Sequence, residues 1–187
     1  MNKATVSLTE TQYRDLIGLI RNGYENHRPN PRIAAALLTE GNLGIRISDV
    51  LALTLSDIIR DGSSWRLNII EKKTKKTRRF TVPDKVYSFL KEYCQKNDIP
   101  PERRIFDIST RQIQSTIKDA SEYLHLQNIS THSFRKTFAT RIYKNSGNNI
   151  RIAQVLLQHS SVSTTQRYIG FDTEEIERAI SQSIDIF

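Results

Sequence analysis

The sequence is poor in the features that mark secreted and membrane proteins. Its 187 residues include a single cysteine, Cys94, so no disulfide can form within the chain, which fits a reducing cytoplasm. The longest purely apolar run, residues 33–38, is six residues long, whereas a membrane-spanning helix needs about 20. The first residues carry no signal-peptide pattern. These absences exclude a membrane-spanning protein and a disulfide-stapled secreted scaffold, and we expect a cytoplasmic protein.

The chain is also short of glycine and proline, with seven and five residues, and has no low-complexity tract or flexible linker. At 37% hydrophobic and 26% charged residues, its composition is that of a folded globular protein. A chain of this length buries about 70% of the surface that it exposes when unfolded. We therefore expect one domain over residues 1–187.

Acidic residues are outnumbered, since 28 Lys+Arg face 20 Asp+Glu and the formal net charge is +8. The excess is densest over residues 72–79, which read KKTKKTRR with no acid among them. Such a run favours contact with a polyanion such as nucleic acid. A solvated hairpin tip explains it about as well, so the charge alone does not decide between the two.

Apolar spacing and capping residues predict a mainly helical chain. Thr9 and Gln12 form a capping box for a helix that ends at Gly23, and Asn30-Pro31 opens a second helix. The alternation over 65–70 and the segment 80–82 predict two antiparallel strands, and the basic run lies on the turn between them. Further helices are expected over 47–53, 84–97, 110–126, 131–145, 148–158 and 173–184. The fold class is thus mainly α with a small antiparallel β-sheet (α+β).

One pair of candidate functional residues lies at the expected start of the helix 131–145. His132 and Arg135 are three residues apart, so their side chains share a face of the first helical turn. A helix N-terminus adds unpaired N–H groups and positive dipole, and the spot therefore suits an anion such as phosphate. Taken alone, the spacing is also that of many ordinary surface pairs.

Three other residues are weak candidates for a functional site when each is considered alone. Arg46 follows Gly44 and precedes Asp49, which is three residues further on and could form an intrahelical ion pair with it. His159 directly follows an apolar helical stretch and could be a capping group, and Tyr168 could be a half-buried aromatic.

Their order along the chain is more specific. Arg46, a lysine in the basic turn, His132-x-x-Arg135, His159 and Tyr168 follow one another in a pattern that resembles the tyrosine recombinase (phage integrase) family. The same resemblance is seen in the flanking segments RISDVLALTLSDI, SFRKTFATRIY and LLQHSSVSTTQRYIG. It extends from Leu8-Thr9 to the C-terminal segment and corresponds to that family's catalytic domain. The family often has different residues at four places, where this chain has Asp49, Phe134, Lys136 and Gln158.

The resemblance implies a transesterification of DNA phosphodiesters that needs no metal, cofactor or ATP. Tyr168 would be the nucleophile and would form a 3′-phosphotyrosyl intermediate. In the implied site, Arg46 and Arg135 hold the non-bridging oxygens, planar forks being suited to that task. The remaining implied roles are proton transfer by His132, a hydrogen bond to the phosphate from His159, and orientation of Arg46 by Asp49.

The general acid for the leaving 5′-oxygen is implied to be a lysine of the basic turn. The pair Lys73-Thr74 looks like the family's Lys-Thr and favours Lys73, whereas counting back from the strand-ending Pro83 favours Lys75. The remaining basic residues of the run are expected to contact the DNA backbone and to steepen the salt dependence of binding. These backbone contacts are Lys72, Lys75, Lys76, Arg78 and Arg79.

The expected partners are double-stranded DNA and further copies of this chain, as a tetramer in the synaptic complex. By the same resemblance, the helix over 173–184 docks on a neighbouring protomer, although packing on its own core is the ordinary reading of its amphipathic pattern. The family's N-terminal core-binding domain is absent from the sequence, and a bacterial or phage origin, close to the nucleoid, is expected. Two alternatives stay open: a non-catalytic DNA-binding module of the same fold, and a DNA-relaxing enzyme like a type IB topoisomerase.

Overall fold

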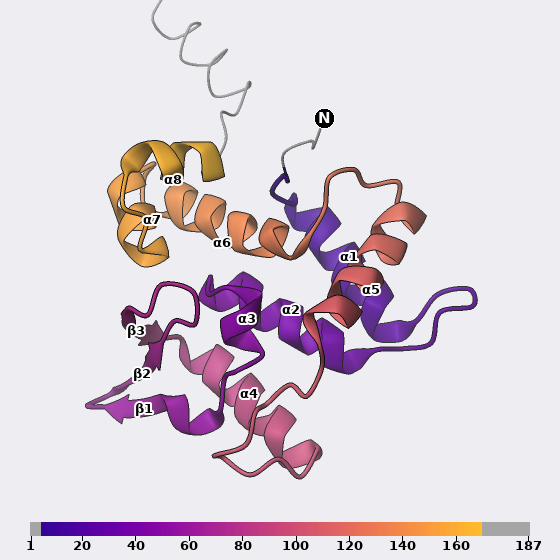
Figure 1. Ribbon diagram of the computed structural model, residues 1–187, viewed down its shortest axis with the longest axis horizontal. Coiled ribbons are helices and arrows are strands. Elements are labelled where there is room, and N and C mark those ends of the chain that lie inside the picture. Colours follow the sequence, from indigo (N-terminus) through magenta and orange to yellow (C-terminus); the bar gives the residue numbers. More distant parts are fainter. Residues whose placement is uncertain (1–4, 170–187) are drawn as a thin grey trace, which may run out of the picture. The chain divides into compact units, whose positions relative to one another are not determined.

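Helices make up about half of the residues that the structure describes, and one small sheet accompanies them (Figure 1). The structure is a computed structural model that describes residues 5–169, so the helix expected over 173–184 lies outside the described residues. The chain divides into two compact units, Met1–Phe138 and Ala139–Phe187. Within the described residues no helix is long and apolar enough to cross a membrane.

The first unit contains most of the elements. They are α1 (Glu10–Asn22), α2 (Pro31–Leu43), α3 (Ile47–Val50), the 3-10 turn η1 (Leu55–Asp57), β1 (Ile58–Asp61), β2 (Ser64–Ile70), β3 (Thr77–Val82), α4 (Asp84–Lys96) and α5 (Thr110–Tyr123). Helix α6 (Thr131–Asn145) starts in the first unit and ends in the second, which also contains α7 (Ile150–Leu157) and α8 (Val162–Ile169). The predicted fold class is confirmed.

The first two helices begin where their capping residues predicted. Thr9 accepts a hydrogen bond from the Gln12 backbone at 3.2 Å, and the Gln12 side chain accepts one from the Thr9 backbone at 3.0 Å. The Asn30 side chain accepts one from Ile33 at 3.1 Å and caps α2. These bonds satisfy backbone N–H groups that have no partner inside the helix, and this is why short-range sequence signals located both helix starts.

Helix α2 is the centre of the first unit's core. It packs against α1 and α3 (Figure 1), and its residues from Ile33 to Leu37 are almost fully buried. It ends at Gly44, whose φ of 59° lies in the left-handed region and favours glycine. A Cβ at this position would lie 2.1 Å from the Phe138 ring. The turn that leads into α3 is therefore fixed both by backbone conformation and by the packing of α6.

The three strands form an antiparallel sheet in the order β1-β2-β3, with Leu67 of β2 paired to Ile58 on one side and to Phe80 on the other. Trp65 stacks on Tyr87 of α4 at a centroid distance of 3.5 Å. The two predicted strands are present; residues 72–76 of the basic run lie on the turn between them, whereas Arg78 and Arg79 belong to β3. Strand β1 was not predicted, because it has four residues and just one of them, Ile58, is buried.

The second unit contains one helix that the sequence reasoning missed, α8. Its eight residues include several β-branched ones, which have low helix propensity. Ser161 begins it, since its hydroxyl accepts a hydrogen bond from the Thr164 backbone at 3.3 Å. Gln158, which stands where the family often has glycine, ends α7 with φ 53° and ψ 37°. A left-handed backbone at this point explains the family's preference.

Candidate active site

Arg46 is the first predicted catalytic residue along the chain, and in the structure its partner is Glu71. Its guanidinium Nη1 lies 2.5 Å from Glu71 Oε2, and the Arg46 side chain is 20% exposed. Among the residues that the structure describes, no other one forms a hydrogen bond or ion pair with the Arg46 side chain. The guanidinium is thus anchored on one side and keeps donors for a ligand on the other.

Glu71 is a functional candidate that the sequence reasoning missed. Its side chain is fully buried and accepts hydrogen bonds from Arg46, from Arg78 Nη1 at 3.1 Å and from Thr74 Oγ1 at 2.7 Å. Burial alone would raise the pKa of this carboxyl, but the Thr74 and Arg46 bonds and the charges of Arg46 and Arg78 bring it below its ordinary value. Glu71 is therefore ionised at neutral pH. The available signal was its position as the acid directly before the basic run.

Asp49 does not orient Arg46 in the structure, and the prediction of that contact was wrong. Its Oδ1 instead accepts a hydrogen bond from the Lys72 backbone at 2.9 Å. Arg46 is the N-cap of α3 and has an extended backbone, so its side chain does not follow the helical i, i+3 geometry that the prediction assumed. Asp49 holds the basic turn, while the carboxylate that contacts Arg46 comes from 25 residues away.

The position of Arg78 in the structure does not fit its predicted role as a contact for the DNA backbone. Its residue exposure is 1%, and it forms an ion pair with Glu71. Burial, followed by the charge of Arg135, lowers the pKa of Arg78 to about 10, so it stays protonated at neutral pH. Alternation along β3 turns Arg78 inward with Val82 and leaves Arg79 outside. The other four predicted contacts, Lys72, Lys75, Lys76 and Arg79, are exposed.

The adjacent pair Arg78 and Arg79 allows a direct test of this difference. We expect Arg78→Ala to lower the free energy of unfolding by about 3 kcal/mol, because it breaks a buried ion pair. Arg79→Ala should change it by no more than about 0.5 kcal/mol and should reduce the slope of log K against log salt for DNA binding by about 0.9. Urea unfolding and salt titrations of both variants measure this, and equal unfolding energies would contradict the assignment.

Arg135 lies near the start of α6, and its side chain is held in the protein interior. It is 1% exposed and donates a hydrogen bond to the Gly44 carbonyl. Glu40 of α2 is fully buried and lies close enough to Arg135 for the two charges to interact. Burial raises the pKa of Glu40 well above its ordinary value, although the charge of Arg135 acts in the opposite direction. A carboxyl with a raised pKa is more readily protonated, so Glu40 offsets the positive charge of Arg135 less than an exposed carboxylate would. It is a second buried acid that sequence reasoning did not single out.

His132, one turn before Arg135, is exposed. Partial burial of its ring, followed by the charges of Arg135, Lys73 and Arg46, lowers the pKa of His132 below its ordinary 6.5. The imidazole is therefore neutral at pH 7 and able to accept a proton. The charges of three predicted catalytic residues of the first unit, Arg46, Lys73 and Arg135, thus act on the fourth, His132.

The two lysines between which the sequence left the choice open differ in the structure. Lys73 is exposed, and its charge is among those that lower the pKa of His132, whereas that of Lys75 is not. Lys75 has φ 57° and donates its backbone N–H to the Glu71 carbonyl at 2.9 Å. The effect of the Lys73 charge on His132 favours Lys73 over Lys75 as the candidate acid.

The net charge of this cluster suits an anion. Two guanidiniums, from Arg46 and Arg78, pair with the Glu71 carboxylate, and the charge of Arg135 acts on that of Arg78. Positive charge in a low-dielectric surrounding attracts a counter-ion more strongly than the same charge in water. The arrangement fits a phosphodiester, whose two non-bridging oxygens can each accept from a guanidinium.

In the second unit, the structure brings His159 and Tyr168 together. Their rings meet edge to face with centroids 4.9 Å apart, and both side chains are half-buried. His159 Nδ1 lies 3.1 Å from Thr165 Oγ1, which orients the ring. The Gln154 side chain donates to the His159 carbonyl at 3.1 Å and fixes the backbone. A phenol beside an oriented imidazole is a suitable pair for nucleophilic attack.

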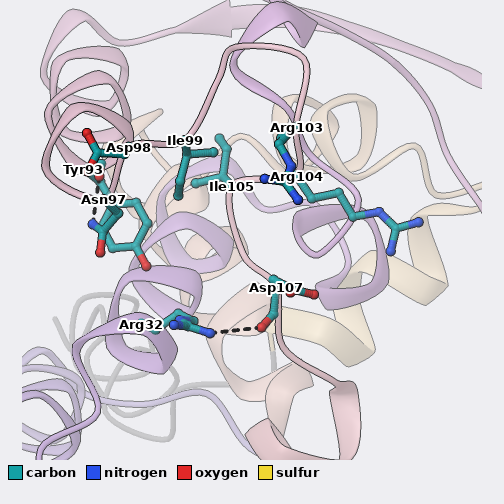
Figure 2. A pocket seen from close by; sticks show the side chains of 9 residues that line it. All are labelled: Arg32, Tyr93, Asn97, Asp98, Ile99, Arg103, Arg104, Ile105 and Asp107. Atoms are coloured by element: carbon teal, nitrogen blue, oxygen red, sulfur yellow. Dashed lines mark hydrogen bonds between the residues drawn. The ribbon is translucent and has the colours of Figure 1, made fainter.

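A polar cavity of about 400 Å³ in the first unit contains none of these residues (Figure 2). Arg32 lies on one side of it and donates to the Asp107 carbonyl at 3.1 Å, and Arg103 and Arg104 lie on another (Figure 2). None of the predicted catalytic residues lines this cavity, so it is not part of the candidate active site.

Comparisons with known proteins show the family to which the sequence is similar. The sequence model of the phage integrase family matches residues 7–175. The probable integrase/recombinase YoeC of Bacillus subtilis is 33% identical over 145 residues, which are 74% of this chain and 76% of that protein. The tyrosine recombinase XerC of Nitrobacter winogradskyi is 33% identical over 154 residues, 78% of this chain and 47% of that protein.

Among solved structures, the XerH site-specific recombinase bound to palindromic difH substrate superposes with a TM-score of 0.71 at 20% identity. The match covers 96% of this chain and 54% of that one. This likeness shows the fold. The chain spans about half the length of XerC and of XerH, and about three quarters of YoeC.

Proposed function

The chain belongs to the phage integrase family, and on that premise we propose that it breaks and rejoins DNA strands as the catalytic part of a site-specific tyrosine recombinase. The observation that carries the proposal is that Arg46 and Arg135 are each held in place, by Glu71 and by the Gly44 carbonyl, with their charges and that of Lys73 acting on the His132 imidazole. These groups are an anion clamp, an acid and a base.

The proposed reaction is an exchange of phosphate esters. The Tyr168 hydroxyl gives up its proton as it attacks phosphorus, and a 3′-phosphotyrosyl bond forms as the bond to the 5′-oxygen breaks; in the proposal His132 assists this proton transfer. Lys73 gives its proton to that leaving oxygen. In the second half, a 5′-hydroxyl attacks the phosphotyrosyl ester and the phenol leaves, so the ester is conserved throughout.

The remaining side chains hold the phosphate. In the proposal Arg46 and Arg135 donate to the two non-bridging oxygens, where negative charge grows in the transition state. His159 adds a further hydrogen bond, and its contact with the Tyr168 ring supports a shared role for these two. Asp49, which bonds the Lys72 backbone, stabilises the turn that carries Lys73.

We further propose double-stranded DNA as the partner, a function in the cytoplasm near the nucleoid, and assembly as a tetramer on paired sites. The exposed residues Lys72, Lys75, Lys76 and Arg79 are the proposed contacts to the DNA backbone. The XerH structure, with its bound difH substrate, supports DNA as the ligand of this fold. Binding should be strongly salt-dependent, since it rests on released counter-ions.

Covalent trapping tests the function without knowledge of the target site. The chain is incubated with duplexes that carry a random segment of about three helical turns of DNA, roughly 30 base pairs, and a nick that lets the cleaved end diffuse away. Denaturing gels then recover DNA that stays attached to protein. The proposal predicts attached DNA with a common sequence, linked through Tyr168 in mass spectra of tryptic peptides.

Two outcomes favour the alternative functions. Salt-sensitive binding without any covalent product would indicate a non-catalytic DNA-binding module. Relaxation of supercoiled plasmid that lacks the recovered site, with no exchange between paired sites, would indicate a relaxing enzyme like a type IB topoisomerase.

The pH dependence of cleavage tests the role of His132. Because its pKa in the free protein lies below 6.5, kcat/KM should be constant above pH 6.5 and should fall as the imidazole gains a proton below it. His132→Gln should lower the rate by about 100-fold and remove this acid limb. Single-turnover rates on the recovered duplex measure both effects. An acid limb that persists unchanged in the variant would assign the proton to another group.

A further inference from the structure

We propose that Glu71 is a positioning residue that fixes the Arg46 guanidinium relative to the turn that carries Lys73. The inference rests on the proposed function and goes beyond it, since it assigns a role to a residue outside the set of groups that contact the phosphate. It is based on three contacts of one buried carboxylate, all within the first unit.

The first contact fixes the arginine. Arg46 is the N-cap of α3, where no side-chain hydrogen bond caps the helix, and its guanidinium meets Glu71 Oε2 at 2.5 Å. No other described residue forms an ion pair or hydrogen bond with the Arg46 side chain. The direction of its remaining donors therefore depends on Glu71.

The second contact fixes the turn. Thr74 Oγ1 donates to the same oxygen, Oε2, at 2.7 Å, and Thr74 is the residue after Lys73. The Glu71 backbone closes the turn from its other side, donating to the Lys76 carbonyl at 3.0 Å and accepting from Lys75 at 2.9 Å. The exposed lysine thus sits on a turn whose inner side is tied to the carboxylate that holds Arg46.

The third contact keeps the carboxylate in place. Arg78, itself buried, donates to Oε1 at 3.1 Å, so each oxygen of Glu71 has a charged donor. A buried carboxylate with this many donors has one favoured orientation. A glutamine could not replace it, because one of its two terminal atoms is an NH₂ group that would face a guanidinium donor.

The test compares Glu71→Gln and Thr74→Val with the wild type on three versions of the recovered nicked duplex. The first has the ordinary phosphodiester. The second has sulfur in place of the leaving 5′-oxygen; a thiol has a pKa of about 8.5 and leaves without a proton from Lys73. The third is a methylphosphonate, which lacks one charged oxygen and so depends less on a guanidinium clamp.

We expect Glu71→Gln to cleave the ordinary substrate on the order of 100-fold more slowly, as for a reacting group displaced by about 1 Å. Its deficit against the wild type should shrink at least about tenfold on both altered substrates, a change that corresponds to 1.36 kcal/mol in the barrier. Thr74→Val should cleave the ordinary substrate about tenfold more slowly, the equivalent of one hydrogen bond. Its cleavage rate should approach that of the wild type on the sulfur substrate but not on the methylphosphonate.

The inference is overturned if Glu71→Gln cleaves within about threefold of the wild type, roughly 0.65 kcal/mol in the barrier. It is also overturned if the deficit is the same on all three substrates, as a merely structural role would give. Should Glu71→Gln fail to fold, as circular dichroism would show, Thr74→Val decides alone: selective recovery on sulfur supports the inference, and no deficit or a uniform one overturns it.

Asp61→Asn is the matched control, because Asp61 is an exposed carboxylate of the same sheet that pairs with Arg66. Its rates should equal those of the wild type on every substrate. The wild type in the same assay separates the two proposals. Without any adduct through Tyr168 the proposed function fails, whereas an unchanged Glu71→Gln beside an active wild type contradicts the positioning role alone.

Discussion

Replacing Tyr168 by phenylalanine should leave no detectable covalent protein–DNA product, because the change removes the oxygen that attacks phosphorus. The ring itself is kept, and with it the edge-to-face contact with His159 at 4.9 Å. We therefore expect the free energy of unfolding to change by no more than about 1.5 kcal/mol, the upper value for one hydrogen bond. Duplex affinity should stay within about twofold of the wild type, since phosphate contacts elsewhere dominate binding.

The measurement is the amount of end-labelled duplex that migrates with protein on a denaturing gel, with affinity from a native gel at one salt concentration. Tyr143→Phe serves as the control, because Tyr143 is another half-buried tyrosine of the second unit and should not affect product. If Tyr168→Phe still attached DNA, the nucleophile would be a different side chain and the reaction proposed here would be incorrect.

Substituting Arg135 should have the second large effect. Arg135→Ala should reduce cleavage by on the order of 10²–10³-fold, as for loss of one donor to a developing oxyanion. DNA affinity should fall by no more than about tenfold, because one phosphate contact among many carries little of it. The side chain is buried against the Gly44 carbonyl, so alanine should also cost about 3 kcal/mol of stability.

Arg135→Lys separates the two effects. A lysine keeps the charge beside Glu40 and can still donate to one acceptor, but it has no planar fork to hold an oxygen and the Gly44 carbonyl at once. We expect much of the stability to return and cleavage to remain at least about 100-fold below the wild type. Thermal unfolding and single-turnover rates measure the two separately. Equal losses of affinity and of cleavage would contradict the assigned role.

Local patterns predicted the features that depend on near neighbours in the chain. The capping box at Thr9 and the Asn30-Pro31 start of α2 act within three or four residues, so both could be identified from sequence. Strand β1 and helix α8 were missed because neither has a strong pattern of its own. β1 is stabilised by its pairing with β2, and α8 consists largely of residues with weak helix propensity.

Charge patterns were the least reliable guide. The run after Glu71 looked uniformly solvated, yet strand alternation buries Arg78 and exposes Arg79. Counting by twos from the buried Val82 would have indicated this. The partner of Arg46 could not be found in the same way. The rule for i, i+3 pairs pointed to Asp49, while the observed carboxylate, Glu71, arrives through the pairing of β2 and β3.

The sequence by itself determined the types of reacting group and their order, because residue identity sets what can attack, donate or hold charge. It also determined the mainly helical fold class, since helix periodicity and caps are local. Only the tertiary structure decided which partners the charged side chains have: Glu71 pairs with Arg46 and Arg78, Arg135 donates to the Gly44 carbonyl, and the charge of Lys73 acts on His132. The choice of partner depends on segments far apart in the chain, and spacing along the sequence carries no record of it.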